Sequence, residues 1–225
     1  DLHRRRHSFP TRRSSDLDGV LDTGGAPLVA PYTGGEALRS PFNPYIFHVR
    51  AGYVDETEHM VHQAATLGMT RIAVMYQNDA FGKAGLAGVE AALAKRNMQM
   101  LVAASYERNT DEVADAVQKI KAAEPQATIM ISVNRSTAAF AKQYRAAGGG
   151  GQLYNISVVD PAELVKLAGT KAVHGLGISQ VHLDKIFTMF YRATSSSTGS
   201  GLGLYILKET VEDPPLTVSS QVFIT

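Results

Sequence analysis

Short runs of apolar and β-branched residues alternate, along the middle of the chain, with longer segments in which apolar residues recur every three or four positions. The first pattern is typical of buried strands and the second of helices with one buried face. Strands are predicted at residues 71–76, 98–106, 127–132, 153–158 and 175–181. Helices are predicted at residues 55–67, 82–95, 111–123 and 136–147.

The helix predicted at residues 111–123 has the clearest pattern. Val113, Val117 and Ile120 form its apolar stripe. Asn109 or Thr110 can cap its start, and Glu112 follows Asn109 at the spacing of a capping box.

Helices that alternate with strands imply right-handed crossovers and a mostly parallel sheet covered on both faces. The fold class expected for residues 18–181 is therefore a doubly wound, Rossmann-like α/β layer. Four glycines at 148–151 follow a predicted helix rather than a strand. We interpret them as a helix stop and loop, not as a phosphate-binding loop.

Composition adds few constraints. The chain has 225 residues, of which 44% are hydrophobic and 19% charged, as is usual for a protein that buries a core. It has no cysteine, which excludes disulfides, thiolate metal sites and a cysteine nucleophile. No apolar run approaches the roughly 18–20 residues of a membrane span, and no signal peptide is recognisable in this chain.

The net charge of +1 is unevenly distributed, because residues 1–16 hold five arginines and only two aspartates. A basic arm can bind nucleic acid, and a twin-arginine pair can direct export. Neither interpretation is favoured, because no basic helix face and no apolar segment accompany the arginines. Residues 1–17 are expected to form an extended, disordered tail without a nucleic-acid partner. Residues 3–17 also closely resemble a translated sequencing-adapter peptide, to which we assign no biological role.

Two predicted turns at the carboxyl ends of strands are candidates for ligand binding, since ligands of doubly wound sheets lie there. Thr33 and Gly34 follow an apolar run expected to be buried, and they lead into a predicted helical segment at residues 36–39. The turn amides can face a carboxylate at a helix start, or Thr33 can be a plain N-cap. Phe81 follows a polar turn, where it can line a pocket or simply be buried.

Ordered landmarks along the same region resemble a known family. They lie at residues 33–39, 43–50, 55–57, 78–82, 111, 120–123 and 146–148. The chain over residues 18–181 resembles the periplasmic solute-binding proteins of branched-chain amino-acid ABC transporters. This resemblance implies a type I periplasmic binding protein with two lobes that close on a small amino-acid-like ligand, a periplasmic location, and a transporter permease as partner.

The resemblance also implies site residues. Thr33 and Gly34 correspond to the turn that holds the charged end groups of the amino acid, and Phe81 to the aromatic residue that closes from the second lobe. Phe81 lacks the hydroxyl that many relatives carry there. Asp160 or Glu163 corresponds to the acidic partner of the ammonium group, although both are also ordinary carboxylates of a helix start. Only about thirty residues precede Thr33, so the first lobe is expected to be truncated and the protein inactive as written.

Residues 182–225 resemble a different family. Residues 183–192 and 197–208 are similar to the aromatic box and the second glycine box of the α/β-sandwich ATPase domain of histidine kinases, with Gly199, Gly201 and Gly203 as lid glycines. The alternative function is therefore a sensor histidine kinase. The adenine pocket, the magnesium-binding asparagine segment and the phosphoacceptor helix of that family are missing, so we expect an inactive fragment and a chimeric reading frame.

No other residues indicate enzymatic chemistry. His59 and His62 lie three apart on a predicted helix, but no third ligand of suitable spacing joins them, which favours solvated histidines. We therefore expect no catalytic residues, no metal and no cofactor.

Overall fold

The computed structural model describes residues 28–43 and 45–179. The predicted tail at 1–17 and the kinase-like fragment at 182–225, with Gly199, Gly201 and Gly203, lie outside the described residues. Five parallel strands form the main sheet in the order β4-β3-β5-β6-β7. They are β3 (Ile72–Gln77), β4 (Val102–Tyr106), β5 (Ala127–Ile131), β6 (Gln152–Asn155) and β7 (Gly177–Ile178).

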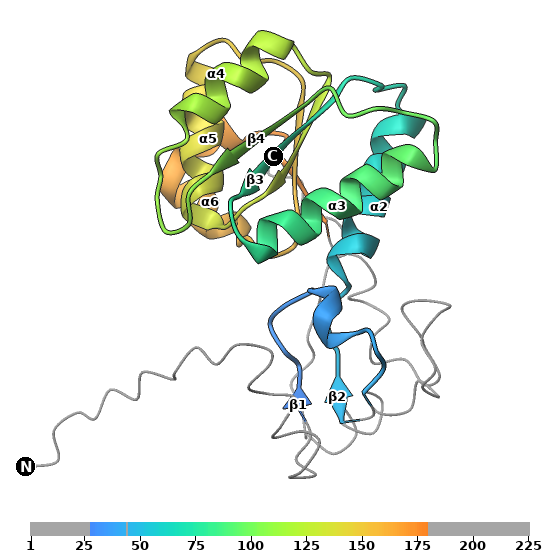
Figure 1. Ribbon diagram of the computed structural model, residues 1–225. Helices are drawn as coiled ribbons and strands as arrows, with labels where there is room; N and C mark the ends of the chain where they lie inside the picture. Colours follow the sequence, from blue (N-terminus) through green and yellow to red (C-terminus); the bar gives the residue numbers. More distant parts are fainter. Residues whose placement is uncertain (1–27, 44, 180–225) are drawn as a thin grey trace, which may run out of the picture.

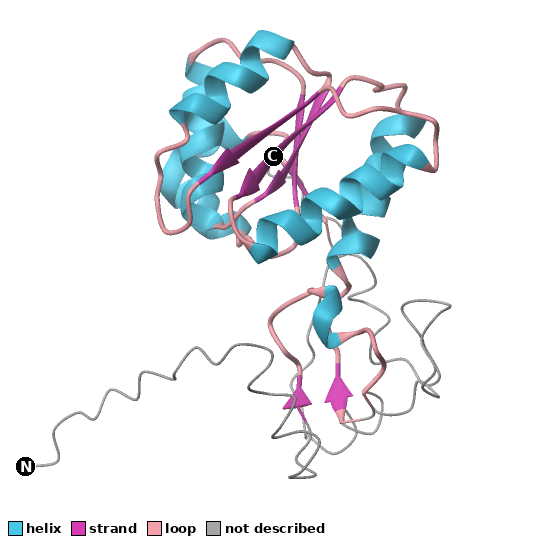
Figure 2. Ribbon diagram, in the orientation of Figure 1, coloured by secondary structure: helices cyan, strands magenta, loops and turns pink. Residues whose placement is uncertain are grey.

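Helices cover both faces of this sheet (Figures 1 and 2). Helices α2 (Tyr53–Thr66) and α3 (Ala80–Ala94) pack together on one face. The other face carries α4 (Ala114–Ala123), α5 (Asn134–Ala146) and α6 (Pro161–Ala168), and a short helix α7 (Thr170–Val173) follows. The strand order reverses at β3, which places the topological switch point between β3 and β5. The predicted parallel α/β fold is confirmed.

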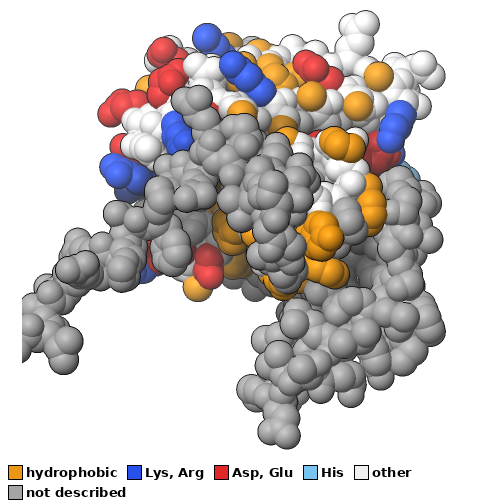
Figure 3. Space-filling model, turned by 60° about the horizontal axis from the view of Figure 1, so that its bottom comes forward, with side chains coloured by type: hydrophobic (Ala, Val, Ile, Leu, Met, Phe, Trp, Pro, Cys, Tyr) orange, Lys and Arg blue, Asp and Glu red, His pale blue; other side chains and the backbone are white. Residues whose placement is uncertain are grey.

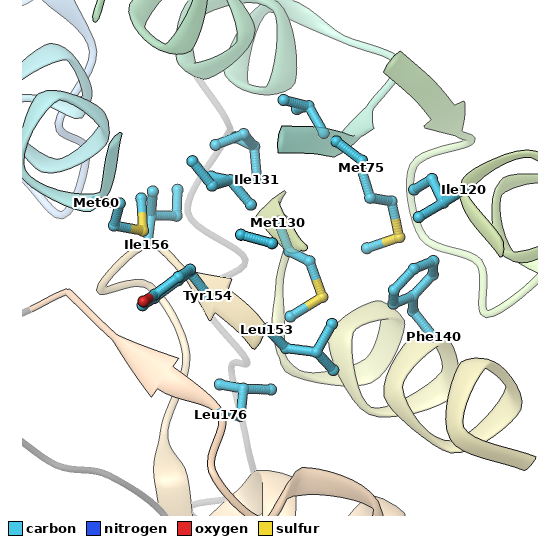
Figure 4. Packing of buried hydrophobic residues seen from close by; sticks show 14 of the residues in the cluster. Met60, Met75, Ile120, Met130, Ile131, Phe140, Leu153, Tyr154, Ile156 and Leu176 are labelled. Carbon is cyan, nitrogen blue, oxygen red and sulfur yellow. The ribbon is translucent and has the colours of Figure 1, made fainter. Parts of the chain in front are cut away.

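The core lies on both sides of strands β3 and β5. Every residue of β5 is buried, as is every residue of β3 except Tyr76, because helices cover both faces of these strands. Figure 4 shows how methionine and branched side chains fill the space between sheet and helices. The side chains labelled there are Met60, Met75, Ile120, Met130, Ile131, Phe140, Leu153, Tyr154, Ile156 and Leu176.

A smaller unit precedes this layer and lies below it in Figure 1. Strand β1 (Leu28–Val29) pairs in parallel with β2 (Ile46–Phe47), and the 3₁₀ helix η1 (Glu36–Leu38) lies between them in the chain. We call residues 28–52 the N-terminal segment. The apolar run predicted to be buried here is not, because Val29 is 45% exposed. Other large hydrophobic side chains of the segment are also exposed, namely Tyr32, Phe42, Tyr45 and Phe47. Figure 3 brings the bottom of the molecule forward and shows hydrophobic side chains exposed on that face.

Several predicted boundaries are wrong for local reasons. Helix α4 begins at Ala114 rather than at residue 111, and the predicted capping box does not form. The Thr110 hydroxyl instead accepts the amide of Glu112 at 2.9 Å, which holds a turn in place of the first helical residues. Strand β4 begins only at Val102, although apolar residues precede it.

The predicted end of helix α5 agrees with the structure. Helix α5 ends at Ala146, and Gly148 follows with φ +79°. The Gly148 amide donates to the Arg145 carbonyl at 3.0 Å, and the Gly149 amide donates to the Tyr144 carbonyl at 2.8 Å. This pair of bonds is a Schellman motif, so the interpretation of the glycines as a helix stop is confirmed.

Helix α3 approaches its neighbours closely along a row of glycines. A Cβ added at Gly82 would lie 1.8 Å from the Gln77 carbonyl oxygen. A Cβ at Gly85 would lie 2.5 Å from a methyl carbon of Ile131, and one at Gly88 would lie 2.4 Å from the Thr57 hydroxyl. These three positions therefore fix how near α3 lies to β3, β5 and α2.

Candidate functional site

Three of the predicted ligand-binding residues meet at one side chain, that of Tyr53. The Tyr53 hydroxyl lies 3.3 Å from the Thr33 hydroxyl. The Tyr53 ring meets the Phe81 ring edge to face, with centroids 5.3 Å apart and planes at 75°. We call Thr33, Gly34, Tyr53 and Phe81 the Tyr53 cluster. It joins the N-terminal segment to the start of α2 and the start of α3.

Gly34 belongs to this cluster because its backbone lies against Tyr53. The Tyr53 amide donates to the Gly34 carbonyl at 2.8 Å. A Cβ at Gly34 would lie 2.7 Å from the Ala51 carbonyl oxygen and 2.8 Å from Tyr53 Cδ1. No larger residue fits there without movement of the turn or of the ring.

Thr33 is not the N-cap of the helix that follows it. That helix is the three-residue η1, whose N-cap is Gly35 and lacks a side-chain cap. The Thr33 hydroxyl accepts the Gly35 amide at 3.1 Å and closes a turn inside the segment. The Gly35 amide is therefore already paired.

The polar turn before Phe81 is occupied by structural bonds. Asp79 caps α3, because its carboxylate accepts the Gly82 amide at 3.0 Å. The other carboxylate oxygen accepts the Gln77 side-chain amide at 2.6 Å. The Tyr106 hydroxyl donates to the Gln77 side-chain oxygen at 3.2 Å, and burial raises the pKa of Tyr106 to about 12. These bonds fix the start of α3, and with it the half-buried Phe81 ring.

Asp160 lies at the start of α6. Its carboxylate accepts the Glu163 amide at 3.0 Å, and its own amide donates to the Asn134 side chain at 2.7 Å. The Glu163 carboxylate lies 3.8 Å from the Lys166 ammonium group. Both acidic residues thus have the contacts of helix-start carboxylates, and their role toward a ligand stays a prediction.

A second group of polar residues, next to the Tyr53 cluster, is built around a buried carboxylate on α2, that of Glu56. Glu56 is 0% exposed, and burial raises its pKa, although bonds from Ser157 and the nearby charges of Arg50 and Arg39 oppose this shift. Ser157 donates its amide to Glu56 Oε2 at 2.6 Å and its hydroxyl to Glu56 Oε1 at 2.8 Å. The Ser157 carbonyl accepts a bond from the Arg50 guanidinium.

A buried polar network lies at the carboxyl ends of β5 and β6. The Asn155 side-chain oxygen accepts the Ser132 hydroxyl at 2.9 Å and the Thr137 hydroxyl at 3.2 Å. The Asn155 side-chain nitrogen donates to the carbonyls of Ser132 and Ile156, both at 3.0 Å. The Asn155 side-chain amide thus makes four hydrogen bonds, which hold the ends of β5 and β6 together.

Tyr53, Arg50, Glu56 and Ser157 were not predicted as site residues from the sequence. Tyr53 and Glu56 lie on the buried stripe of α2, together with Thr57, Met60, Val61 and Ala64. A carboxylate at an apolar stripe position was a signal that could have indicated Glu56. Arg50 and Ser157 carry no comparable signal, because both lie in irregular segments.

Other features of the described residues indicate no further chemistry. No group of three or more potential metal-binding side chains occurs in residues 28–43 and 45–179, and His59 and His62 both lie on the exposed side of α2. Within the same ranges, no helix is both long and apolar enough to cross a membrane. A cavity of about 210 Å³ lies at the opposite edge of the sheet, lined by Lys121, Glu124, Pro125, Tyr144 and Gly148–Gly150.

A parallel α/β layer whose carboxyl edge contacts a separate segment is the arrangement of one lobe of a two-lobed binding protein. The family model described as periplasmic binding protein matches residues 12–184, and the chain belongs to this family. Membership implies a periplasmic or extracellular location. Among curated proteins, none matches the chain.

Solved structures support the assignment. A substrate-binding periplasmic protein from Ralstonia solanacearum is 40% identical, with a TM-score of 0.67, over 72% of this chain and 45% of that one. An extracellular ligand-binding receptor from Verminephrobacter eiseniae is 31% identical, with a TM-score of 0.66, over 72% and 46%. A branched chain amino acid ABC transporter from Thermus thermophilus with bound valine shares the fold at 17% identity and a TM-score of 0.66, over 88% and 49%. The chain thus spans about half the length of these proteins.

Proposed function

We propose that this chain is part of the substrate-binding component of an ABC transporter for amino acids or similar small solutes. The observation that carries the proposal is the Tyr53 cluster. The family resemblance assigns Thr33 and Gly34 to the ligand's charged groups and Phe81 to the opposite lobe, and Tyr53 contacts all three residues. The valine bound to the Thermus relative supports an amino-acid ligand.

We further propose that, within the described residues, the N-terminal segment represents part of the first lobe. Parallel strands are normally buried on both faces, whereas β1 and β2 expose Val29 and Phe47 at 45% and 39%. The matched part of the chain also covers only 45% and 46% of the Ralstonia and Verminephrobacter relatives' own length. A ligand held by one lobe keeps much of its hydration, so the chain alone should bind weakly. The family relation to solute-binding proteins supports a binding role rather than an enzymatic one. The permease as partner and the kinase-like fragment at 182–225 stay predictions.

Calorimetry with aliphatic amino acids tests the function on two proteins, the chain itself and a hybrid that adds the first lobe of the Ralstonia relative. We expect weak binding by the chain and tight binding by the hybrid. Thr33→Val in the hybrid removes a hydroxyl at nearly constant volume and should weaken binding about tenfold, the effect of one lost hydrogen bond of ~1.4 kcal/mol. Thr66→Val is the matched control, because the Thr66 hydroxyl donates only to the His62 carbonyl on the exposed side of α2. Equal affinities of the two variants would remove Thr33 from the site.

A further inference from the structure

The loop after β6 is held on several sides by charged side chains from elsewhere in the chain. Ser157 donates both its amide and its hydroxyl to the Glu56 carboxylate, and its carbonyl accepts from Arg50. Each polar group of this one residue therefore bonds to an ionic side chain. Charge-assisted hydrogen bonds are roughly twice as strong as neutral ones and are more directional.

Arg50 extends these bonds to the N-terminal segment. Its guanidinium donates through Nη1 to the Tyr32 carbonyl at 3.0 Å and through Nη2 to Ser157. The guanidinium carbon also lies 4.5 Å from the centroid of the Tyr32 ring. The Tyr32 hydroxyl in turn donates to the Val158 carbonyl at 3.2 Å. We call Tyr32, Arg50, Glu56, Ser157 and Val158 the Arg50 tie.

The tie acts next to the candidate site, because Tyr32 directly precedes Thr33 and Gly34. Its main chain, ring and hydroxyl are each bonded, even though the side chain is 73% exposed and gains little from burial. The hydrophobic effect therefore does little to fix Tyr32, the first residue of this turn. Directional bonds to Arg50 and Val158 hold Tyr32, while Gly34 at the other end of the turn is bonded to the Tyr53 amide.

We propose that the Arg50 tie sets the position of the Tyr32–Gly34 turn against the carboxyl edge of the main sheet, and that Arg50, Glu56 and Ser157 are positioning residues for the ligand site. The use of the turn for a ligand rests on the proposed function. The tie itself can be tested without ligand, so its failure and the failure of the proposed function are distinguishable.

The test uses the full chain, whose lack of cysteine permits two clean label sites. Ala37→Cys on η1 and Gln143→Cys on α5 place nitroxide labels at exposed positions on the two sides of the tie. Pulsed electron paramagnetic resonance then gives the distribution of distances between the labels. We expect a single narrow peak for the labelled chain, and loss of this peak in Arg50→Gln.

Arg71→Gln is the matched control. Arg71 also donates a guanidinium bond to a carbonyl, that of Ala123 at 2.5 Å, but this bond lies entirely within the main layer. The narrow peak should survive in this variant, whatever its melting temperature. A narrow, unshifted peak in Arg50→Gln would overturn the proposal.

Tyr32→Phe decides in the same way should Arg50→Gln not fold. It removes only the hydroxyl bond to Val158 and keeps the ring beneath Arg50. The peak should broaden or shift at unchanged melting temperature, because the exposed hydroxyl contributes position rather than burial. An unchanged peak in Tyr32→Phe would then refute the tie.

Discussion

Gly82→Ala should be among the most damaging single-methyl additions in the described part of this protein. The added Cβ would lie 1.8 Å from the Gln77 carbonyl oxygen, whereas real contacts of this kind stay above 3.0 Å, so α3 or β3 must move by at least 1.2 Å. Both elements are part of the core, and β3 is an interior strand of the sheet, paired with β4 on one side and β5 on the other. Overpacking of a core costs about 1–3 kcal/mol, and we expect the upper end of that range because the obstacle is backbone.

The cost is measurable by urea denaturation followed by circular dichroism. Gly150→Ala is the control, because a Cβ there meets nothing within 4 Å and its φ is not in the left-handed region. Alanine at such a position stabilises the protein by about 0.4–1 kcal/mol, because it reduces the conformational freedom of the unfolded chain. Gly82→Ala should also displace the neighbouring Phe81 ring from Tyr53. Equal unfolding midpoints for the two variants would refute the argument from close approach.

Two further predictions concern buried polar groups. Burial raises the pKa of Glu56 above that of the unfolded chain, so its protonation favours the fold; this contribution is fully present below the unfolded pKa and is lost as the pH rises through the folded pKa. The stability of the wild type relative to Glu56→Gln should therefore increase as the pH is lowered from 7 towards 5, and a difference independent of pH in denaturation curves would contradict this. Asn155→Ala leaves the carbonyls of Ser132 and Ile156 without their donor and should cost about 1–3 kcal/mol for each buried group left unpaired. A loss below 1 kcal/mol would show that water replaces the amide.

The sheet and its helices were predictable because parallel strands covered on both faces leave continuous apolar runs. β3 and β5 match their predicted ranges to within one residue at each end. The start of α4 was not predictable in this way. Val113 is buried outside the helix, where it looks the same in sequence as the first residue of the helical stripe.

The candidate site was predictable only in part. Thr33, Gly34 and Phe81 were predicted because they lie in turns after strand-like runs and match a family pattern, and their role toward a ligand stays a prediction. Tyr53, which brings them together, has the spacing of an ordinary core residue, and it is in fact 4% exposed. Its second role depends on where its hydroxyl points, and periodicity carries no information about that direction.

The Arg50 tie also has a consequence for the order in which the protein folds. Its bonds join residues 101 and 107 positions apart in the chain, from Glu56 and from Arg50 to Ser157. Such contacts are closed late, since the entropy of loop closure must be overcome before they can form. We therefore expect the intervening strands β3, β4, β5 and β6 to assemble first, and the tie to stabilise the native state more than the transition state. Loss of the tie should speed unfolding while leaving the rate of folding nearly unchanged.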